Sequence, residues 1–390
     1  MHITRRGFLA TSAGLLAAGR MAAAEDASPK LRACIIGDTK MGGYGHDLHL
    51  AWAHRDDVEV VGLADPDAGG RLRHAGRAKA QRVYTDYREM LETEKPDLVT
   101  IAPRTTVRHA EYLLAAAACG AHGFMEKPMA VDLAEADAMI EAVEAKRLKW
   151  AIAFNWRTAP VIEHARRLVV EEGLIGELLE ARGRGKEDHR GGGEDLIVLG
   201  VHVFDLMRFF AGDPEWCMAD VAVEGRPATL ADVREATEPL GPIFGDALHA
   251  VYGFPNGVRG YFASRQTDGN AGRWGLDLYG TKGIVIIRFE TQGGTKARVL
   301  RDPAWAPGMG EAACEPLPDI PAETELAGAP DRYAAITNDL IAAIREDRAP
   351  KVSLQDGRAA HEMIQAVFAA HLRGGRVAMP LAERAHPLKT

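Results

Sequence analysis

The chain has 390 residues, and its 55 aspartates and glutamates outnumber its 47 lysines and arginines, which gives a formal net charge of −8. This acidic balance argues against nucleic acid or an anionic lipid surface as a partner, because both attract basic proteins. The length predicts two domains, and no internal repeat or membrane-spanning stretch is present.

The first 24 residues have the features of an export signal that belongs to neither domain. Residues 4–9, TRRGFL, resemble a twin-arginine signal, which is an address for exporting folded proteins. The apolar run that follows is too short to cross a bilayer, and the alanines at 22–24 suit a signal peptidase. We therefore expect a periplasmic or otherwise exported protein; the alternative is a frayed amphipathic terminus.

A glycine turn follows the first predicted strand, residues 30–37. Gly37 and Gly42 are the first and third glycines of a G-x-G-x-x-G pattern, and further glycines precede an expected helix. Backbone N–H groups and the positive end of a helix can face a pyrophosphate in such a turn. Thr39 departs from the pattern, because it stands where the second glycine lets a cofactor approach the backbone.

An acid closes the next predicted strand, residues 58–65, and strengthens this interpretation. Asp65 stands 23 residues beyond Gly42, where a carboxylate accepts hydrogen bonds from both ribose hydroxyls and repels a 2′-phosphate. NAD is thus favoured over NADP as the cofactor. NADP stays the alternative, because Arg71 and Arg73 lie nearby in the sequence.

Two more strand and helix units extend this pattern to a doubly wound parallel sheet. A strand at 81–86 leads to a helix at 87–94, and a strand at 97–102 leads to Pro103. The carboxyl edge of that sheet then carries three polar residues, Thr105, Thr106 and His109. His109 fits a packing role better than a catalytic one.

The sequence Glu126-Lys127-Pro128 ends the next strand and is the strongest sign of a site. Pro128 forces the chain out of the sheet and holds Lys127 at its carboxyl edge, where open α/β sheets bind ligands. A helix then begins after Asp132, which can cap it. The alternative is that Glu126 and Lys127 form an ordinary solvated ion pair.

A second domain begins near residue 154 and brings a second polar cluster. After a helix at 160–172 and a strand at 177–184, a helix from Asp195 to Phe210 carries polar groups on one face. The alternative for His202 on that face is a core histidine satisfied by Asp205. His189 lies among acids that could ligate a metal, but no fixed ligand spacing supports a metal site.

The rest of the chain predicts one broad sheet and two closing helices. The expected strands are 217–223, 247–254, 258–264, 274–279 and 284–289, and the expected helices are 333–345 and 354–371. Residues 290–330 are expected to be a long, irregular excursion. The four cysteines form no C-x-x-C pair, and we expect Cys34 and Cys119 to be buried thiols.

Together these motifs resemble the Gfo/Idh/MocA family of oxidoreductases over essentially the whole mature chain. The resemblance implies an N-terminal Rossmann domain at 30–153 and a C-terminal α/β domain at 154–388, whose open, mostly antiparallel sheet covers the nicotinamide and often mediates oligomerisation. It implies that Lys127 lies beside the nicotinamide and the reacting hydroxyl, and it raises the expectation of a cis bond before Pro128. The cofactor-binding residues it implies are Gly37, Thr39, Gly42, Asp65, Pro103, Thr105, His109, Glu126 and Lys127.

The chain departs from the family pattern at one position. Gly200, His202 and Asp205 fit the family's second motif, but Val198 stands where that motif has an aspartate. The standard proton relay is therefore in doubt, and Asp195, one turn earlier, is the candidate substitute carboxylate.

These features lead to a first hypothesis and two alternatives. The first is an NAD(H)-dependent oxidoreductase acting on the CH–OH group of a sugar or polyol, homo-oligomeric and with tightly bound cofactor; its catalytic residues would be Lys127, His202 and Asp195, with no metal. One alternative is a redox-neutral glycosidase, lyase or epimerase that uses bound NAD for transient oxidation. The other is a non-catalytic sugar-binding protein.

Overall fold

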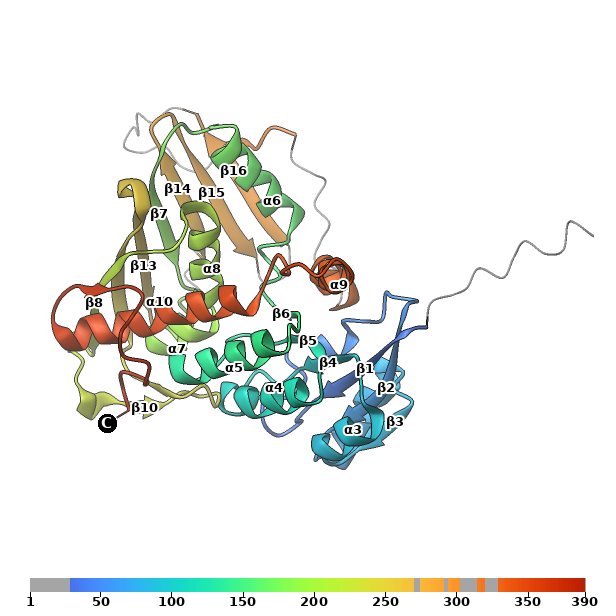
Figure 1. Cartoon of the computed structure of the whole chain (residues 1–390). Coiled ribbons are helices and arrows are strands. Elements are labelled where there is room, and N and C mark those ends of the chain that lie inside the picture. The colour runs from blue at the N-terminus through green and yellow to red at the C-terminus, as the bar shows by residue number, and fades with distance from the viewer. Residues whose placement is uncertain (1–28, 270–273, 291–293, 302–313, 320–328, 390) are drawn as a thin grey trace, which may run out of the picture.

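A computed structural model gives the structure of residues 29–269, 274–290, 294–301, 314–319 and 329–389. The expected leader at 1–24 lies outside these residues. The described chain folds into two α/β domains joined near residue 153 (Figure 1). No described helix is long and apolar enough to cross a membrane.

The first domain is a parallel sheet of six strands in the order β3-β2-β1-β4-β5-β6. Its strands are β1 (Leu31–Ile36), β2 (Val58–Ala64), β3 (Arg82–Tyr84), β4 (Leu98–Ile101), β5 (His122–Met125) and β6 (Trp150–Ile152). Its helices are α2 (Ala68–Ala78), α3 (Tyr87–Glu94), α4 (His109–Ala118) and α5 (Leu133–Ala145). The core strands β1 and β4 are almost wholly apolar because both faces of the sheet are covered. The predicted doubly wound sheet is confirmed.

The helix expected directly after the glycine turn is absent, which corrects the sequence prediction. The chain there forms turns and a single 3₁₀ turn, η2 (Leu48–Leu50). The reason is local, because Gly42, Gly43, Gly45 and Asp47 all have left-handed backbone angles, with φ of 88°, 64°, 57° and 65°. A right-handed helix cannot continue through such residues.

The second domain is built on a ten-stranded sheet in the order β17-β16-β15-β14-β7-β13-β12-β8-β18, with β9 paired to β8. Its strands are β7 (Leu178–Arg184), β8 (Trp216–Val223), β9 (Arg226–Pro227), β12 (Ala247–Gly253), β13 (Arg259–Arg265), β14 (Gly275–Gly280), β15 (Gly283–Glu290), β16 (Gly294–Leu300), β17 (Glu315–Pro316) and β18 (Val377–Ala378). A separate short pair joins β10 (Arg234–Glu235) to β11 (Pro242–Ile243). Among the described strands of this sheet, only β7 and β13 pair in parallel, so the prediction of a mostly antiparallel sheet is confirmed.

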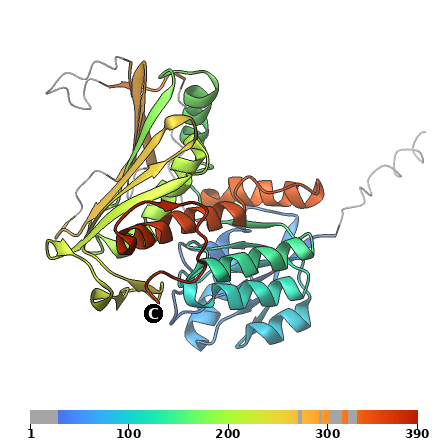
Figure 2. The same cartoon turned by 60° about the vertical axis from the view of Figure 1, so that its left-hand side comes forward.

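Helices cover one face of the large sheet (Figure 2). These are α6 (Pro160–Arg166), α7 (Gly193–Val198), α8 (Gly200–Ala211) and α10 (Leu354–Arg373). Helix α10 also packs on α5 and β6, so it lies between the two domains. The remaining helix, α9 (Ala329–Arg345), packs against β6 and η2 of the first domain.

Three further predictions need correction. Cys34 is buried as expected, but Cys119, also expected to be a buried thiol, is exposed. Strand β16 runs through a segment that was expected to be irregular, and its alternating residues Thr295, Ala297 and Val299 are buried at 4%, 4% and 0% exposure. The helix expected from Asp195 to Phe210 breaks at Leu199, so that α7 and α8 are separate. This break matters for the site, because it frees a backbone carbonyl.

Candidate active site

Lys127 occupies the position that the sequence predicts, at the carboxyl end of β5. Its bond to Pro128 is cis, as expected. The side chain is buried, and Nζ donates a hydrogen bond of 2.9 Å to the backbone carbonyl of Val198. That carbonyl has no helical partner, because the helix breaks at the next residue. Burial lowers the pKa of Lys127, and Glu126 opposes this shift.

The neighbouring Glu126 is not part of a solvated surface pair. Its carboxylate is fully buried and accepts hydrogen bonds from the backbone and ring nitrogens of His46, at 3.0 and 2.9 Å, and from the backbone of Lys127 at 3.1 Å. Burial alone would raise the pKa of Glu126, but His46 and Lys127 outweigh it and hold it at about 2. Glu126 therefore remains ionised and anchors the strand end on which Lys127 stands.

His202 projects from α8 into an aromatic pocket. Trp156 and Phe154 contact its ring, with centroids at 4.5 and 5.8 Å. Its Nδ1 is buried and has no hydrogen-bond partner among the described residues. Burial, and then the positive charge of Lys127, place the pKa of His202 well below its usual value. The imidazole is therefore neutral at pH 7 and can accept a proton.

Asp205 does not satisfy His202, so the structure differs from the alternative of a core histidine paired with this acid. The Asp205 carboxylate is bound instead by Arg157, through Nε at 3.0 Å and Nη2 at 2.5 Å. Arg157 also binds Asp356 at the start of α10, at 2.8 Å. This buried network ties α8 to α10 and leaves His202 without an acidic partner from its own helix.

Asp195, the candidate substitute for the missing acid, lies in α7 and contacts the segment that follows β7. It is fully buried and accepts hydrogen bonds from Ser264 Oγ at 2.5 Å and from the backbones of Lys186 and Glu187 at 3.3 and 3.2 Å. These partners fix the loop at the end of β7. The structure thus does not bring Asp195 together with His202 in a hydrogen bond.

Glu238 is a residue near Lys127 that the sequence analysis missed. It lies in the connection between β10 and β11, and its carboxylate is 3.5 Å from Nε of Arg104. Its charge raises the pKa of Lys127, whereas Arg104 and Arg190 lower it. The preceding Thr237 donates from its backbone to Glu194 of α7 at 3.1 Å, which fixes the connection. No motif or periodicity marks this acid, and only the fold brings it to the first domain.

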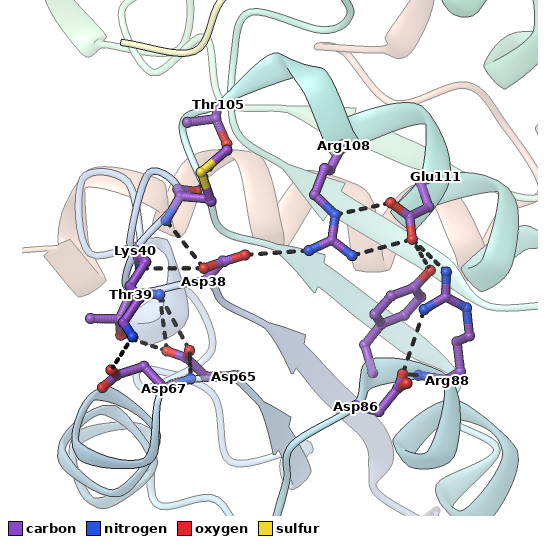
Figure 3. A network of polar contacts seen from close by, with 12 residues as sticks. Asp38, Thr39, Lys40, Asp65, Asp67, Asp86, Arg88, Thr105, Arg108 and Glu111 are labelled. Atoms are coloured by element: carbon purple, nitrogen blue, oxygen red, sulfur yellow. Dashed lines mark hydrogen bonds and ion pairs between the residues drawn. The ribbon is translucent and has the colours of Figure 1, made fainter.

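The expected ribose-binding acid, Asp65, is fully buried and has several donors from the protein itself. Thr39 binds it through Oγ1 at 2.6 Å and through its backbone nitrogen at 3.2 Å, and Tyr44 binds it through its hydroxyl at 2.8 Å. The backbone of Asp67 adds a further bond of 2.9 Å. Figure 3 shows Asp65 with Thr39 and Asp67 beside the glycine turn. A ribose would have to replace some of these donors, so this role of Asp65 stays a prediction.

The glycine turn packs tightly on the end of β4. A Cβ at Gly42 would lie 2.7 Å from the backbone nitrogens of Arg104 and Thr105, so this glycine is required by close packing as well as by its φ. Thr105 Oγ1 donates to the carbonyl of Met41 at 2.9 Å. A Cβ at Gly37 would overlap the ring of Tyr44, at 2.2 Å. The turn is thus held against the carboxyl edge of the sheet, as predicted.

His109 has the packing role that we considered the better fit. It is fully buried at the start of α4, and its two ring nitrogens lie 2.7 Å from the carbonyl oxygen of Pro103 and 2.9 Å from that of Pro128. It therefore joins the ends of β4 and β5. His189 is exposed, and no group of three or more potential metal ligands occurs in the described parts of the chain.

Buried polar atoms that make no hydrogen bond indicate where a dinucleotide could bind between the two domains. Three such atoms make no hydrogen bond among the described residues, on Arg104 Nε, Thr106 Oγ1 and His202 Nδ1, although Arg104 Nε has an ionic contact of 3.5 Å with Glu238. Buried polar groups require partners, so these atoms fit a polar ligand between the two domains. The residues therefore fit the nicotinamide half of a dinucleotide, whereas Asp65 and its neighbours at the other half bind one another.

Comparison with known proteins identifies the family. Residues 31–154 match the model "Oxidoreductase family, NAD-binding Rossmann fold", and residues 177–379 match "Oxidoreductase family, C-terminal alpha/beta domain". The chain therefore belongs to the Gfo/Idh/MocA oxidoreductase family.

Two relatives indicate the range of this family. Levoglucosan dehydrogenase of Pseudarthrobacter phenanthrenivorans is 27% identical over 257 residues, which are 60% of this chain and 65% of that protein. D-apiose dehydrogenase of Paraburkholderia graminis is 34% identical over 183 residues, 44% of this chain and 48% of that protein. The matches thus span less than two thirds of each relative.

Solved structures agree with the fold. The complex of levoglucosan dehydrogenase with NADH and L-sorbose has a TM-score of 0.71 at 23% identity and covers 90% of this chain and 100% of that one. An aldose-aldose oxidoreductase from Caulobacter crescentus, complexed with glycerol, has a TM-score of 0.68 at 20% identity and covers the same shares, 90% and 100%. At these identities the likeness establishes the two-domain fold.

Proposed function

We propose that this protein is an NAD(H)-dependent oxidoreductase that acts on the CH–OH group of a sugar or polyol. The observation that carries the proposal is the buried Lys127, held at the carbonyl of Val198 and near enough to His202 for its charge to lower the pKa of that imidazole further. The named activities of the relatives, on levoglucosan, D-apiose and myo-inositol, support carbohydrate as the substrate class.

Each of the two residues has a defined task. The bound nicotinamide supplies the chemistry of accepting a hydride from the carbinol carbon. Lys127 donates a hydrogen bond to the substrate hydroxyl and stabilises negative charge on its oxygen. His202 is neutral and accepts the hydroxyl proton at a ring nitrogen. The alcohol thus loses a hydride and a proton, and its C–O bond becomes a carbonyl.

The cofactor that we propose is NAD(H). Asp65, fully buried at the end of β2, disfavours a 2′-phosphate by its charge. Gly37, Gly42, Pro103 and Thr105 form the edge against which the dinucleotide would lie. The solved complexes of relatives with NAD+ and NADH support this choice.

A second candidate is a redox-neutral reaction, such as elimination or epimerisation, in which the hydride returns to the same substrate. It is favoured by the absence of an acid at Val198 and by the engagement of Asp205 with Arg157, which leave His202 without the usual carboxylate. Incubating the purified protein with NAD+ and a panel of sugars separates the two. Net oxidation gives one NADH per product, measured at 340 nm and by mass spectrometry, whereas the redox-neutral reaction gives product without NADH. Absence of any product, with NAD+ bound and unreduced, would support a non-catalytic sugar-binding protein.

We further propose that the chain is exported in its folded state with the cofactor bound. The twin-arginine pattern at residues 4–9 supports this, since that route carries folded proteins. Fractionation of expressing cells, followed by gel filtration and nucleotide analysis of the exported protein, tests it. Protein recovered only from the cytoplasm would contradict export, and exported protein free of nucleotide would contradict retention.

We also propose a homo-oligomer formed through the large sheet. Among the described residues, the helices cover only one of its faces, and the other carries Met218 at 47% exposure beside the partly exposed Val251 and Tyr261. Apolar surface of this kind is typical of subunit interfaces. Light scattering on a size-exclusion column would contradict this proposal if it gave the mass of a single chain.

A further inference from the structure

The Asp38 side chain fills the inside of the glycine turn. Its Oδ1 accepts hydrogen bonds from the backbone N–H groups of Lys40 and Met41, at 3.3 and 3.1 Å (Figure 3). The backbones of Asp38 and Gly43 exchange two hydrogen bonds, at 3.2 and 2.7 Å, which close the turn around this carboxylate. Asp38 is only 5% exposed. The N–H groups at the centre of the turn therefore already have an anionic acceptor.

The other oxygen of Asp38 faces Arg108. The distance from Oδ2 to Nη1 of Arg108 is 3.4 Å, which is long for an ion pair. Arg108 is bound more closely by Glu111, through Nε at 2.9 Å, and its guanidinium lies 4.7 Å from the ring centroid of Tyr112. Arg108 is thus held in place by α4 whether or not Asp38 remains beside it.

A small cavity adjoins this pair. It has a volume of about 90 Å³ and is lined by residues that include Gly37, Arg88, Arg108 and Tyr112. The cavity opens at the carboxyl ends of β1 and β2, next to the turn. A ligand that entered the crevice from this side would meet Asp38 and Arg108 together.

Backbone N–H groups of a glycine turn are the donors that bind a dinucleotide's diphosphate in this fold. In this chain the same donors bind the buried carboxylate of Asp38, which is negatively charged like the diphosphate. Asp38 and a diphosphate cannot use them at once, and a nearby negative charge would repel the diphosphate in this poorly solvated position. Arg108 could then bind the diphosphate, because it has a fixed position and a loose contact with Asp38.

We propose that Asp38 is an internal competitor for the diphosphate of the cofactor, and that it sets the affinity of the site for dinucleotides. In the free protein Asp38 occupies the phosphate-binding turn, and on binding it yields the turn and Arg108 to the diphosphate. The inference rests on the proposed NAD(H) site and adds a residue that limits the affinity of that site. Asp38 weakens retention of the cofactor, so removing its charge should strengthen retention.

Isothermal titration of the purified full-length protein, stripped of any nucleotide that it retains, with NADH, ADP and adenosine tests this inference. Asp38→Asn removes the charge and keeps an oxygen that can accept from Lys40 and Met41, and Asp38→Ala removes the acceptor as well. Asp56→Asn is the matched control, since it makes the same change at an exposed residue before β2, at the opposite edge of the sheet. We expect both Asp38 variants to bind NADH and ADP about tenfold more tightly than the wild type, as removal of one close like charge implies. Adenosine, which has no diphosphate, should bind equally to all four proteins.

Thermal unfolding without ligand confirms that each variant is folded. Unchanged or weaker binding of NADH and ADP by both Asp38 variants would overturn the inference, and so would an equal gain for adenosine or for Asp56→Asn. Failure of the proposed function has a different signature, namely that neither the wild type nor any variant binds NADH.

Discussion

The ammonium group of Lys127 lies 2.9 Å from the backbone carbonyl oxygen of Val198, the residue at which the family motif has an acid. A main-chain carbonyl that is freed by a helix break thus holds this lysine, with no side-chain carboxylate at that position. A carbonyl carries no formal charge, so it orients the ammonium without neutralising it. This arrangement leaves Lys127 able to stabilise charge on a substrate oxygen.

Replacement of Lys127 should remove turnover while leaving cofactor binding. Lys127→Met keeps the length and apolar stem of the side chain but removes the donor, so we expect kcat to fall by about 10³-fold. Lys127→Arg should not restore activity, because a planar guanidinium does not replace a compact ammonium in a buried site. Steady-state kinetics and NADH titration measure the two effects, and a kcat within tenfold of the wild type would remove Lys127 from the mechanism.

His202→Ala should keep the nicotinamide cofactor and lose about 10²- to 10⁴-fold in kcat, the usual contribution of a general base. Because burial and Lys127 depress its pKa, His202 is already in its basic form at pH 7. Activity of the wild type should therefore stay flat as the pH rises from 7 and decline only well below pH 6.5. His202→Gln, which keeps a polar side chain without a titrating group, should lose activity equally. A fully active variant would return His202 to a structural role.

The site should prefer NAD(H) to NADP(H) by at least about tenfold in dissociation constant, because a buried carboxylate disfavours a 2′-phosphate. The structure adds a competing element, since Arg71 binds the backbone carbonyl of Asp65 at 2.5 Å and brings a cation near the same position. Titration with both reduced cofactors, monitored by fluorescence, measures the ratio. Equal affinities would mean that Asp65 does not select the cofactor and that Arg71 offsets its charge.

Asp205→Ala should destabilise the protein by about 3–5 kcal/mol, because it leaves the buried Arg157 guanidinium without its bidentate partner. The control is Asp213→Ala. Asp213 is exposed, and Arg208 keeps its contact with Asp356 at 3.2 Å when Asp213 is removed, so this variant should lose less than about 1 kcal/mol. Urea unfolding gives both values. Similar losses in the two variants would mean that the Arg157 network contributes no special stability.

Three buried histidines predict a loss of stability in mild acid. Burial lowers the pKa of His49 and His386 to about 3 and that of His361 to about 4. In the unfolded chain these groups bind protons from about pH 6.5 downwards, so the unfolded state gains more protons and the free energy of unfolding falls with pH. The slope below pH 6 should approach about 1.4 kcal/mol per pH unit for each histidine. Urea unfolding between pH 7 and 5 measures it, and His361→Gln should reduce the slope by up to about 1.4 kcal/mol per pH unit.

The sequence predicted most of the elements because their signals are local. The end of β5 at Glu126, the cap of α5 at Asp132 and the alternation in β12 and β13 each depend on a few neighbouring residues. The break at Leu199 could not be predicted in this way, since the apolar periodicity of α7 continues into α8. Recruitment of Glu238 to Arg104 depends on the path of a long connection, which no local pattern encodes.

The glycine spacing does not predict that the Asp38 side chain fills the glycine turn. Thr39 departs from the pattern, but the spacing favours an open turn followed by a helix. The left-handed residues at 42–47 instead fold the chain back, so that Tyr44 reaches Asp65 and the turn closes on Asp38. Glycine spacing alone shows where a backbone can bend, and it does not show which side chains fill the bend.

Helix α9, which packs on the first domain, has a consequence for the order of folding. Tyr333 from this helix donates to the carbonyl of His46 at 3.1 Å and packs edge-on against Phe124 of β5, at 5.5 Å between centroids. Ser353 then pairs with Ala151 at the edge strand β6. The sheet that carries the cofactor site is thus completed by residues that follow all but the last described strand of the second domain's large sheet in the chain. We infer that the first domain does not complete its nucleotide site until α9 and Ser353 have been synthesised, so the two domains mature together.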